Sequence, residues 1–299
     1  MKPPLVAGIE AGGTKFVCGV GRNPGEVLRS HRVATTRPAE TLAEVIDFLK
    51  DAEAEFGPLQ ALGVASFGPL DLEASSPTYG SLTTTPKPGW AGFDLRGTLA
   101  AALGRPVAID TDVAGAGLAE ARLGAGRGLA SLAYVTVGTG IGGALIVDGR
   151  PMKGLGHAEM GHIPVQRHPG DAAFAGICPF HGDCLEGLAS GPSARARHGV
   201  PLEQLGQSAP VWPVLADYVA QLCLCVAMIG APQRIVLGGG VMANPVHLPL
   251  VREALHRRNN GYLAHLSGRE VLETYLVAPA LGDHAGLIGA MMLAETVGV

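Results

Sequence analysis

The chain has 299 residues, enough for one large domain or two ordinary ones, and its hydrophobic fraction of 47% supports a substantial core. A charged fraction of 16% argues against disorder, and a net charge of −4 without long basic runs argues against a nucleic-acid partner. The longest apolar stretch, residues 218–232, is too short to span a bilayer, and no signal sequence is visible. We therefore expect a cytoplasmic protein with no membrane partner.

The predicted elements alternate between strands and helices. Residues 5–20 predict two strands around a glycine-rich turn, and the apolar spacing in residues 40–56 predicts an amphipathic helix. Residues 132–149 repeat the pattern of strand, glycine turn and strand. Further strands are expected at 59–67, 106–110 and 234–244, and further helices at 94–104 (with Asp94 as N-cap), 112–126, 210–232 and 283–298.

The recurrence of the glycine hairpin suggests a duplicated α/β architecture. Two similar halves would leave a cleft between them, which is where ligands commonly bind. We expect a smaller domain of residues 1–111 plus 281–299 and a larger domain of residues 112–280.

Residues 64–90 form a long loop with too much Pro and Gly for a central strand. It contains Gly68-Pro69 and ends in "TPKPGW", residues 85–90. Proline fixes φ, so this segment could present a preformed wall to a ligand. The alternative is a surface loop that covers the small domain.

Three glycine-rich turns could bind phosphate through backbone N–H groups. The first turn also carries the hydroxyl of Thr14 and the positive charge of Lys15, but its spacing is neither that of a Walker A loop nor that of a Rossmann fingerprint. Each turn could equally be an ordinary tight turn. They are Gly12-Gly13-Thr14-Lys15, the segment Gly138–Gly143 with Thr139 and Gly140, and Gly238-Gly239-Gly240.

Two carboxylates, Asp110 and Asp112, stand at the end of a predicted strand. Ligand sites of α/β sheets lie at the carboxyl ends of strands, and a carboxylate there could accept a proton from a hydroxyl. A helix N-cap is the competing interpretation.

The spacing Cys178-x-x-His181-x-x-Cys184 predicts a structural zinc site. His162 can be the fourth ligand, with His157 and His168 as alternatives. The five cysteines are odd in number, which favours a reducing compartment over disulfides. The remaining three, Cys18, Cys223 and Cys225, are expected in the core.

Together these motifs resemble the ROK family of sugar kinases, which has the two-domain actin/hexokinase-like (ribonuclease H-like) α/β fold. The resemblance extends over nearly the whole chain, because five motifs occur in the family's order. They are "GIEAGGTK", "DTDV", "VGTGIGGAL", "GHAEMGH" and "IVLGGGV". The stretches "TTTPKPGW" and "CPFHGDCLEG" resemble the bacterial fructokinase branch.

The resemblance implies transfer of the γ-phosphate of ATP, with Mg²⁺, to a hexose hydroxyl, most simply fructose to fructose 6-phosphate. Kinases for glucose, mannose or N-acetylmannosamine are the alternatives, and a homodimer is expected. Asp112 matches the general base. Glu159, His162 and Glu186 match positions at the sugar pocket. His162, Cys178, His181 and Cys184 match zinc ligands, and Thr139, Pro192 and Gly238 to Gly240 match nucleotide contacts.

The chain departs from the common pattern at Thr111, Ala114 and His157, where many relatives have Asn, Asn and a small residue. A sugar-responsive regulator without catalysis is a remote alternative. Such a protein would need an N-terminal helix-turn-helix, and the first phosphate turn begins by residue 8.

Overall fold

The computed structural model describes residues 3–297. Residues 1, 2, 298 and 299, which the expected small domain and C-terminal helix include, lie outside the described residues. The chain forms two compact units. The first contains the described residues up to Leu123, Arg150–His157 and those from Leu281 onward, and the second contains Gly124–Gly149 and Ala158–Ala280. The first unit thus includes the helix at residue 112, where the sequence prediction began the second domain.

The sheet of the first unit has the strand order β3-β2-β1-β4-β5. Strands β1 and β2 form an antiparallel hairpin, and β4 and β5 run parallel to β1. Apolar residues fill β1 and β4 because both faces of the sheet are covered. The strands are β1 (Leu5–Ala11), β2 (Lys15–Gly21), β3 (Arg29–Ala34), β4 (Leu59–Ser66) and β5 (Val107–Thr111). The two-residue strand β8 (Arg150–Pro151) is not part of this sheet.

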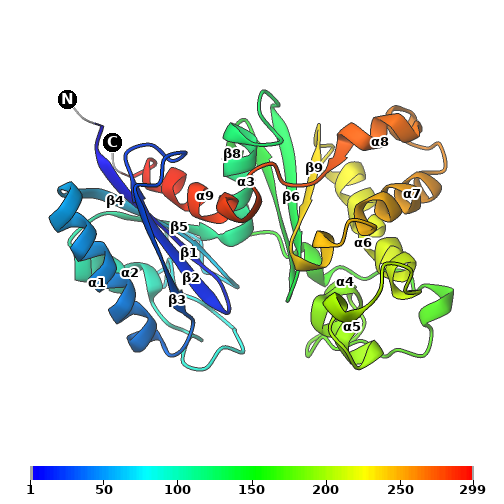
Figure 1. Cartoon of the computed structure of the whole chain (residues 1–299), viewed down its shortest axis with the longest axis horizontal. Coiled ribbons are helices and arrows are strands. Elements are labelled where there is room, and N and C mark those ends of the chain that lie inside the picture. Colours follow the sequence, from blue (N-terminus) through cyan, green and yellow to red (C-terminus); the bar gives the residue numbers. More distant parts are fainter. Residues whose placement is uncertain (1–2, 298–299) are drawn as a thin grey trace. The chain divides into compact units, whose positions relative to one another are not determined.

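Helices cover both faces of this sheet (Figure 1). Helices α1 (Pro38–Phe56) and α2 (Leu95–Leu103) lie on one face, and the predicted cap of α2 is confirmed because Asp94 Oδ1 accepts from Gly97 N at 2.7 Å. Helices α3 (Asp112–Leu123) and α9 (Ala285–Ala294) lie on the other. They cross closely, since a Cβ at Gly289 would lie 1.8 Å from the Gly115 carbonyl oxygen.

The second unit repeats the core topology of the first. Its strands β10-β9-β6-β7 again combine an antiparallel hairpin, β6 and β7, with two parallel neighbours, β9 and β10. Both halves therefore have a glycine turn in the same hairpin position. The strands are β6 (Ser131–Val137), β7 (Ile141–Val147), β9 (Ile235–Gly238) and β10 (Leu276–Val277).

The helices of the second unit surround a core centred on α6 (Val211–Ile229). This helix is long and apolar enough to cross a membrane, but 61% of that window is buried inside the structure, as is typical of a core helix. Of the cysteines expected in the core, Cys18 and Cys223 are buried, whereas Cys225 on α6 is exposed. The other helices are α4 (Leu185–Ala189), α5 (Gly191–His198), α7 (His247–Asn259) and α8 (Arg269–Tyr275).

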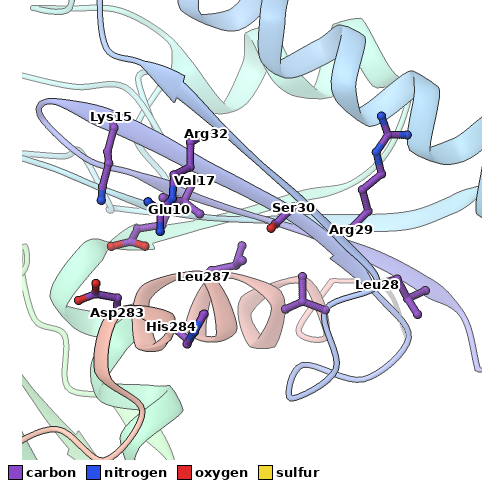
Figure 2. Close-up of a pocket in the computed structure, with 11 residues that line it drawn as sticks. Glu10, Lys15, Val17, Leu28, Arg29, Ser30, Arg32, Asp283, His284 and Leu287 are labelled. Carbon is purple, nitrogen blue, oxygen red and sulfur yellow. The ribbon is translucent and has the colours of Figure 1, made fainter.

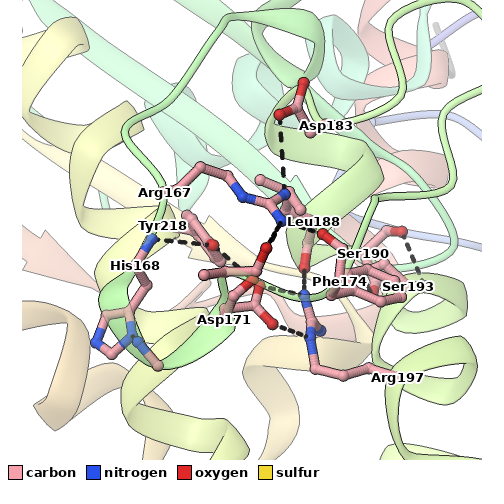
Figure 3. A network of polar contacts seen from close by, with 12 residues as sticks. Arg167, His168, Asp171, Phe174, Asp183, Leu188, Ser190, Ser193, Arg197 and Tyr218 are labelled. Atoms are coloured by element: carbon pink, nitrogen blue, oxygen red, sulfur yellow. Dashed lines mark hydrogen bonds and ion pairs between the residues drawn. The ribbon is translucent and has the colours of Figure 1, made fainter.

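The segment between β7 and α4 is irregular, as expected, and a buried carboxylate organises it (Figure 3). Asp171 is 6% exposed and accepts from Arg197 Nε and Nη2 at 2.7 and 2.9 Å, and from the Tyr218 hydroxyl at 2.9 Å. The Arg197 guanidinium also lies 4.1 Å from the centre of the Phe174 ring. These charge-assisted bonds tie the irregular segment to α5 and α6.

Candidate functional site

The first glycine turn and Asp112 lie at one edge of the first sheet. Parallel pairing places Ala11, Ser66 and Thr111 level on β1, β4 and β5, so the residues that follow them emerge side by side. The turn is closed by a hydrogen bond from Gly12 N to Lys15 O at 3.0 Å. Carboxyl ends of parallel strands are the usual place for a ligand in an α/β protein.

Asp112 is the first residue of α3 rather than its N-cap. The capping bond comes from Thr111, whose Oγ1 accepts from Ala114 N at 3.2 Å. One carboxylate oxygen of Asp112, Oδ1, accepts from Val113 N at 2.8 Å. The carboxylate is thus oriented by its own helix start, and it is half-buried.

The neighbouring carboxylate, Asp110, has a different environment. It is 2% exposed and forms an ion pair with Lys153, with 2.6 Å between Nζ and Oδ2. Its Oδ1 accepts from Thr111 N at 2.8 Å. A buried carboxylate with a cationic partner serves to hold the strand end in place. Of the two aspartates, Asp112 is the less buried.

Glu10 is a functional candidate that the sequence analysis missed. It lines a pocket of about 310 Å³ in which Glu10, Lys15 and Arg32 on the strands face Asp283 and His284, which directly precede α9 (Figure 2). Burial, and then the nearby charge of Asp112, raise the pKa of Glu10 to about 7. The available signal was the glutamate two residues before the first glycine of the turn in "GIEAGGTK".

The long loop after β4 is anchored to this unit rather than loosely covering it. Leu70 N donates to His157 Nε2 at 3.1 Å, and the Trp90 indole N–H donates to Thr36 O at 2.8 Å. His157 therefore serves as a hydrogen-bond acceptor for the long loop, and both lie within the first unit.

The second and third glycine turns come together in the second unit. Parallel pairing sets Thr136 on β6 opposite Gly238 on β9, so both turns leave the same sheet edge. Gly191 N, at the start of α5, donates to Gly138 O at 2.8 Å and brings Pro192 beside them. Gly239 has φ of 94° and a Cβ there would lie 2.4 Å from Val137 O, so only glycine fits. Thr139 is exposed at the tip of its turn.

Glu186 braces the second turn. Its Oε2 accepts from Ile141 N at 2.8 Å, and its Oε1 lies 3.9 Å from His162 Nε2. Glu159 is exposed directly before the short 3-10 turn Met160–His162. His162 thus links the other two predicted sugar-pocket residues, because its backbone N donates to Glu159 O at 3.1 Å and its ring faces Glu186 on α4.

Four side chains of the second unit converge as a metal site would require. The ligand atoms of His162, Cys178, His181 and Cys184 all lie within 4.8 Å of one another. His162 Nδ1 lies 3.7 Å from Cys178 Sγ and 3.5 Å from Cys184 Sγ, and His181 Nδ1 lies 3.7 Å from Cys178 Sγ. Two thiols and two imidazoles in this arrangement match the donor set of a closed tetrahedral zinc site.

The geometry selects His162 from the three possible fourth ligands. His157 bonds Leu70 in the first unit, and His168 Nδ1 accepts from Gly170 N at 3.1 Å outside the cluster. With Nδ1 toward the thiols, His162 turns Nε2 toward Glu186, as metal-bound histidines commonly turn their second nitrogen toward a carboxylate. His162 therefore belongs both to the predicted metal ligands and to the predicted sugar-pocket residues.

The fold and these motifs define a sugar-kinase-like α/β protein, and comparison with known proteins identifies its family. Residues 6–297 match the model of the ROK family, so the chain belongs to that family. It is 43% identical over 290 residues to a fructokinase of Zymomonas mobilis (96% of this chain and 95% of that relative) and 39% identical over 293 residues to a fructokinase of Pediococcus pentosaceus (97% and 98%).

A solved structure supports the same assignment. The ROK hexokinase of Thermus thermophilus matches with a TM-score of 0.78 at 30% identity, covering 98% of both chains. The predicted actin/hexokinase-like α/β fold is confirmed.

Proposed function

We propose that this protein is an ATP-dependent fructokinase that transfers the γ-phosphate of ATP to fructose, giving fructose 6-phosphate. The observation that carries the proposal is near 40% identity, over almost the whole chain, to several relatives named fructokinase. The same motifs that establish the family occur here at strand ends, where ligand groups are expected.

Asp112 is the proposed general base. It takes the proton of the attacking sugar hydroxyl while the sugar oxygen bonds to the γ-phosphorus and the bond to the ADP oxygen breaks. Its position at the edge that also carries the first glycine turn supports this role. Phosphoryl transfer depends mainly on positioning and charge stabilisation, so a correctly placed carboxylate and a set of N–H donors suffice.

The glycine turns are the proposed nucleotide contacts. Gly12, Gly13, Thr14 and Lys15 offer donors in the first unit. The exposed Thr139, with Gly140, Pro192 and Gly238 to Gly240, offers them in the second. Glu159, His162 and Glu186 are the proposed sugar contacts, and the bond from Ile141 N to Glu186 supports a role in holding that pocket rigid.

Two metals belong to the proposal. Zinc would be held by His162, Cys178, His181 and Cys184 and would stabilise the irregular segment around them. Glu10 and Asp112 are close enough to interact electrostatically, and carboxylate oxygens are the kind of ligand that Mg²⁺ prefers. When bound with ATP, Mg²⁺ neutralises charge on the phosphate oxygens. We extend the proposal to a cytoplasmic homodimer, as the family resemblance suggests.

A panel of hexoses with coupled detection of ADP tests the function. We expect fructose to give the highest kcat/KM among fructose, glucose, mannose and N-acetylmannosamine. A higher kcat/KM for one of the other three would assign the protein to that sugar. Absence of ADP formation with all four would remove the kinase proposal and favour a non-catalytic sugar-responsive role.

A further inference from the structure

The proline-rich end of the long loop carries a lysine, Lys87, on a rigidly anchored turn. Its anchor is Trp90, which is 0% exposed and packs with ring centroids 5.4, 5.8 and 5.5 Å from those of Phe16, Phe67 and Phe93. The indole N–H is also satisfied, by Thr36 O. Removing so large a side chain from water fixes the end of the loop against the sheet.

The backbone between anchor and lysine has little freedom. Trp90 N donates to Lys87 O at 3.1 Å, which closes a tight turn. Prolines on both sides of Lys87 restrict φ, and Gly89 has φ of 81°, a conformation that a residue with a side chain rarely adopts. The direction in which Lys87 leaves the loop is therefore set by the fold.

That direction leads to the first phosphate turn. A Cβ built on Gly13 would lie 3.2 Å from Lys87 Cε and 3.7 Å from its Nζ. Gly13 has no side chain, so the lysine can lie against the turn backbone. Lys87 is half-buried, and across residues 3–297 no carboxylate forms an ion pair with it. A cation that is held in place without an acidic partner beside a turn of N–H donors suits an anionic ligand.

Building on the proposed function, we propose that Lys87 contacts the phosphoryl group in transit and is a catalytic cation, in addition to the nucleotide contact proposed for Lys15. Asp112 receives the hydroxyl proton, and Lys87 exchanges no proton. It stabilises the charge on the phosphoryl oxygens while the bond to the sugar oxygen forms and the bond to ADP breaks. This role gives the "TPKPGW" segment a chemical function rather than only that of a wall.

Steady-state kinetics of three variants tests this assignment. Lys87→Met removes the charge and keeps an apolar chain, Lys87→Arg keeps the charge, and Lys50→Met is the control on an exposed position of α1. We expect kcat to fall about 100-fold in Lys87→Met, with the KM for fructose within threefold, because the contact forms with the transferring group. Lys87→Arg should have a kcat of at least about a tenth of the wild-type value, and Lys50→Met should have the kcat of the wild type.

Product binding separates a phosphate contact from a structural role. Fructose 6-phosphate should bind Lys87→Met about tenfold more weakly than wild type, while fructose affinity and melting temperature stay unchanged. An unchanged kcat, or a raised KM for fructose at constant kcat, would overturn the proposal.

If the wild type phosphorylates no hexose, the function fails and Lys87 is judged separately. Thermal protection by inorganic phosphate should then depend on Lys87, and equal protection of wild type and Lys87→Met would refute the assignment.

Discussion

At the scale of single residues, two carboxylates close together in the chain differ in burial and in the groups that hold them. Asp110 is buried and paired with Lys153, whereas Asp112 is oriented by the amide of Val113 at the start of α3. The two side chains are two positions apart, yet only their surroundings distinguish the structural one from the candidate base.

Replacing Asp112 with Asn should remove general-base catalysis and leave the fold intact. We expect kcat to fall by about 10²–10⁴-fold, because an amide cannot accept the hydroxyl proton. Measurement by ADP release should be paired with circular dichroism, and Asp51→Asn, exposed on α1, is the matched control. A variant that retained near-normal turnover would remove Asp112 from the mechanism.

Glu10 should make the protein less stable as the pH rises. Its pKa is about 7 in the folded state, raised from 4.5 by burial and by the charge of Asp112. Between pH 4.5 and 7 the folded protein holds a proton that the unfolded chain has lost, so this contribution to stability disappears as pH rises through that window. The penalty above pH 7 is about 3 kcal/mol at most.

Glu10→Gln should therefore flatten the pH dependence of the unfolding free energy between pH 4.5 and 7. Urea unfolding at several pH values, without ligands, measures the effect, and Glu40→Gln on the exposed start of α1 is the control. If Glu10→Gln and wild type showed the same slope, the raised pKa would be refuted.

At the scale of elements, the segment between β7 and α4 has too little regular structure to be stable alone. Its order comes from the four-ligand cluster and from the bonds of Asp171 to Arg197 and Tyr218. The buried ion pair, together with the proposed metal once bound, would replace the hydrophobic packing that a helix supplies.

Removing the metal should loosen this segment more than the sheets. We expect one zinc per chain, and chelation should raise hydrogen exchange in residues 158–189 while β1 and β6 stay protected. Cys178→Ser should lose the metal, whereas Cys225→Ser, on an exposed cysteine, should keep it. Metal analysis without stoichiometric zinc in the purified protein would count against the site.

At the scale of the whole molecule, we expect Glu10 in the first unit and His247 in the second to change stability with pH in opposite directions. In the second unit His247 is fully buried, its Nδ1 lies 3.1 Å from Val241 O, and among the described residues its Nε2 has no hydrogen-bond partner. Burial lowers the pKa of His247 from 6.5 to about 4. Between pH 6.5 and 4 the unfolded chain binds a proton that the folded unit does not, so stability falls as the pH falls.

We therefore expect acidification from pH 7 to 5 to destabilise the second unit while relieving the penalty of Glu10 in the first. Calorimetry should show the transition of the second unit moving to lower temperature. In His247→Gln this acid-dependent shift should shrink, with His265→Gln, exposed in the same unit, as the control. A transition of the second unit that did not respond to His247→Gln would contradict the burial argument.

Much of the fold follows from local pattern. The glycine hairpins, α1 and α6 were predicted because each carries its own periodicity or turn residues within a short window. By contrast β3 and the helices α7 and α8 were not predicted. The exposed, polar β3 lacks a clear alternation, and α7 combines few buried positions with a charged end.

By itself the sequence determined the family, the alternating α/β elements, and the ligands within Cys178–Cys184, because these depend on residues close together in the chain. Only the tertiary structure brought His162 to Cys178, His181 and Cys184, placed Glu10 where burial and the charge of Asp112 raise its pKa, and set Lys87 against Gly13. Such contacts join positions far apart in the chain. They arise from strand register and packing, which no local spacing encodes.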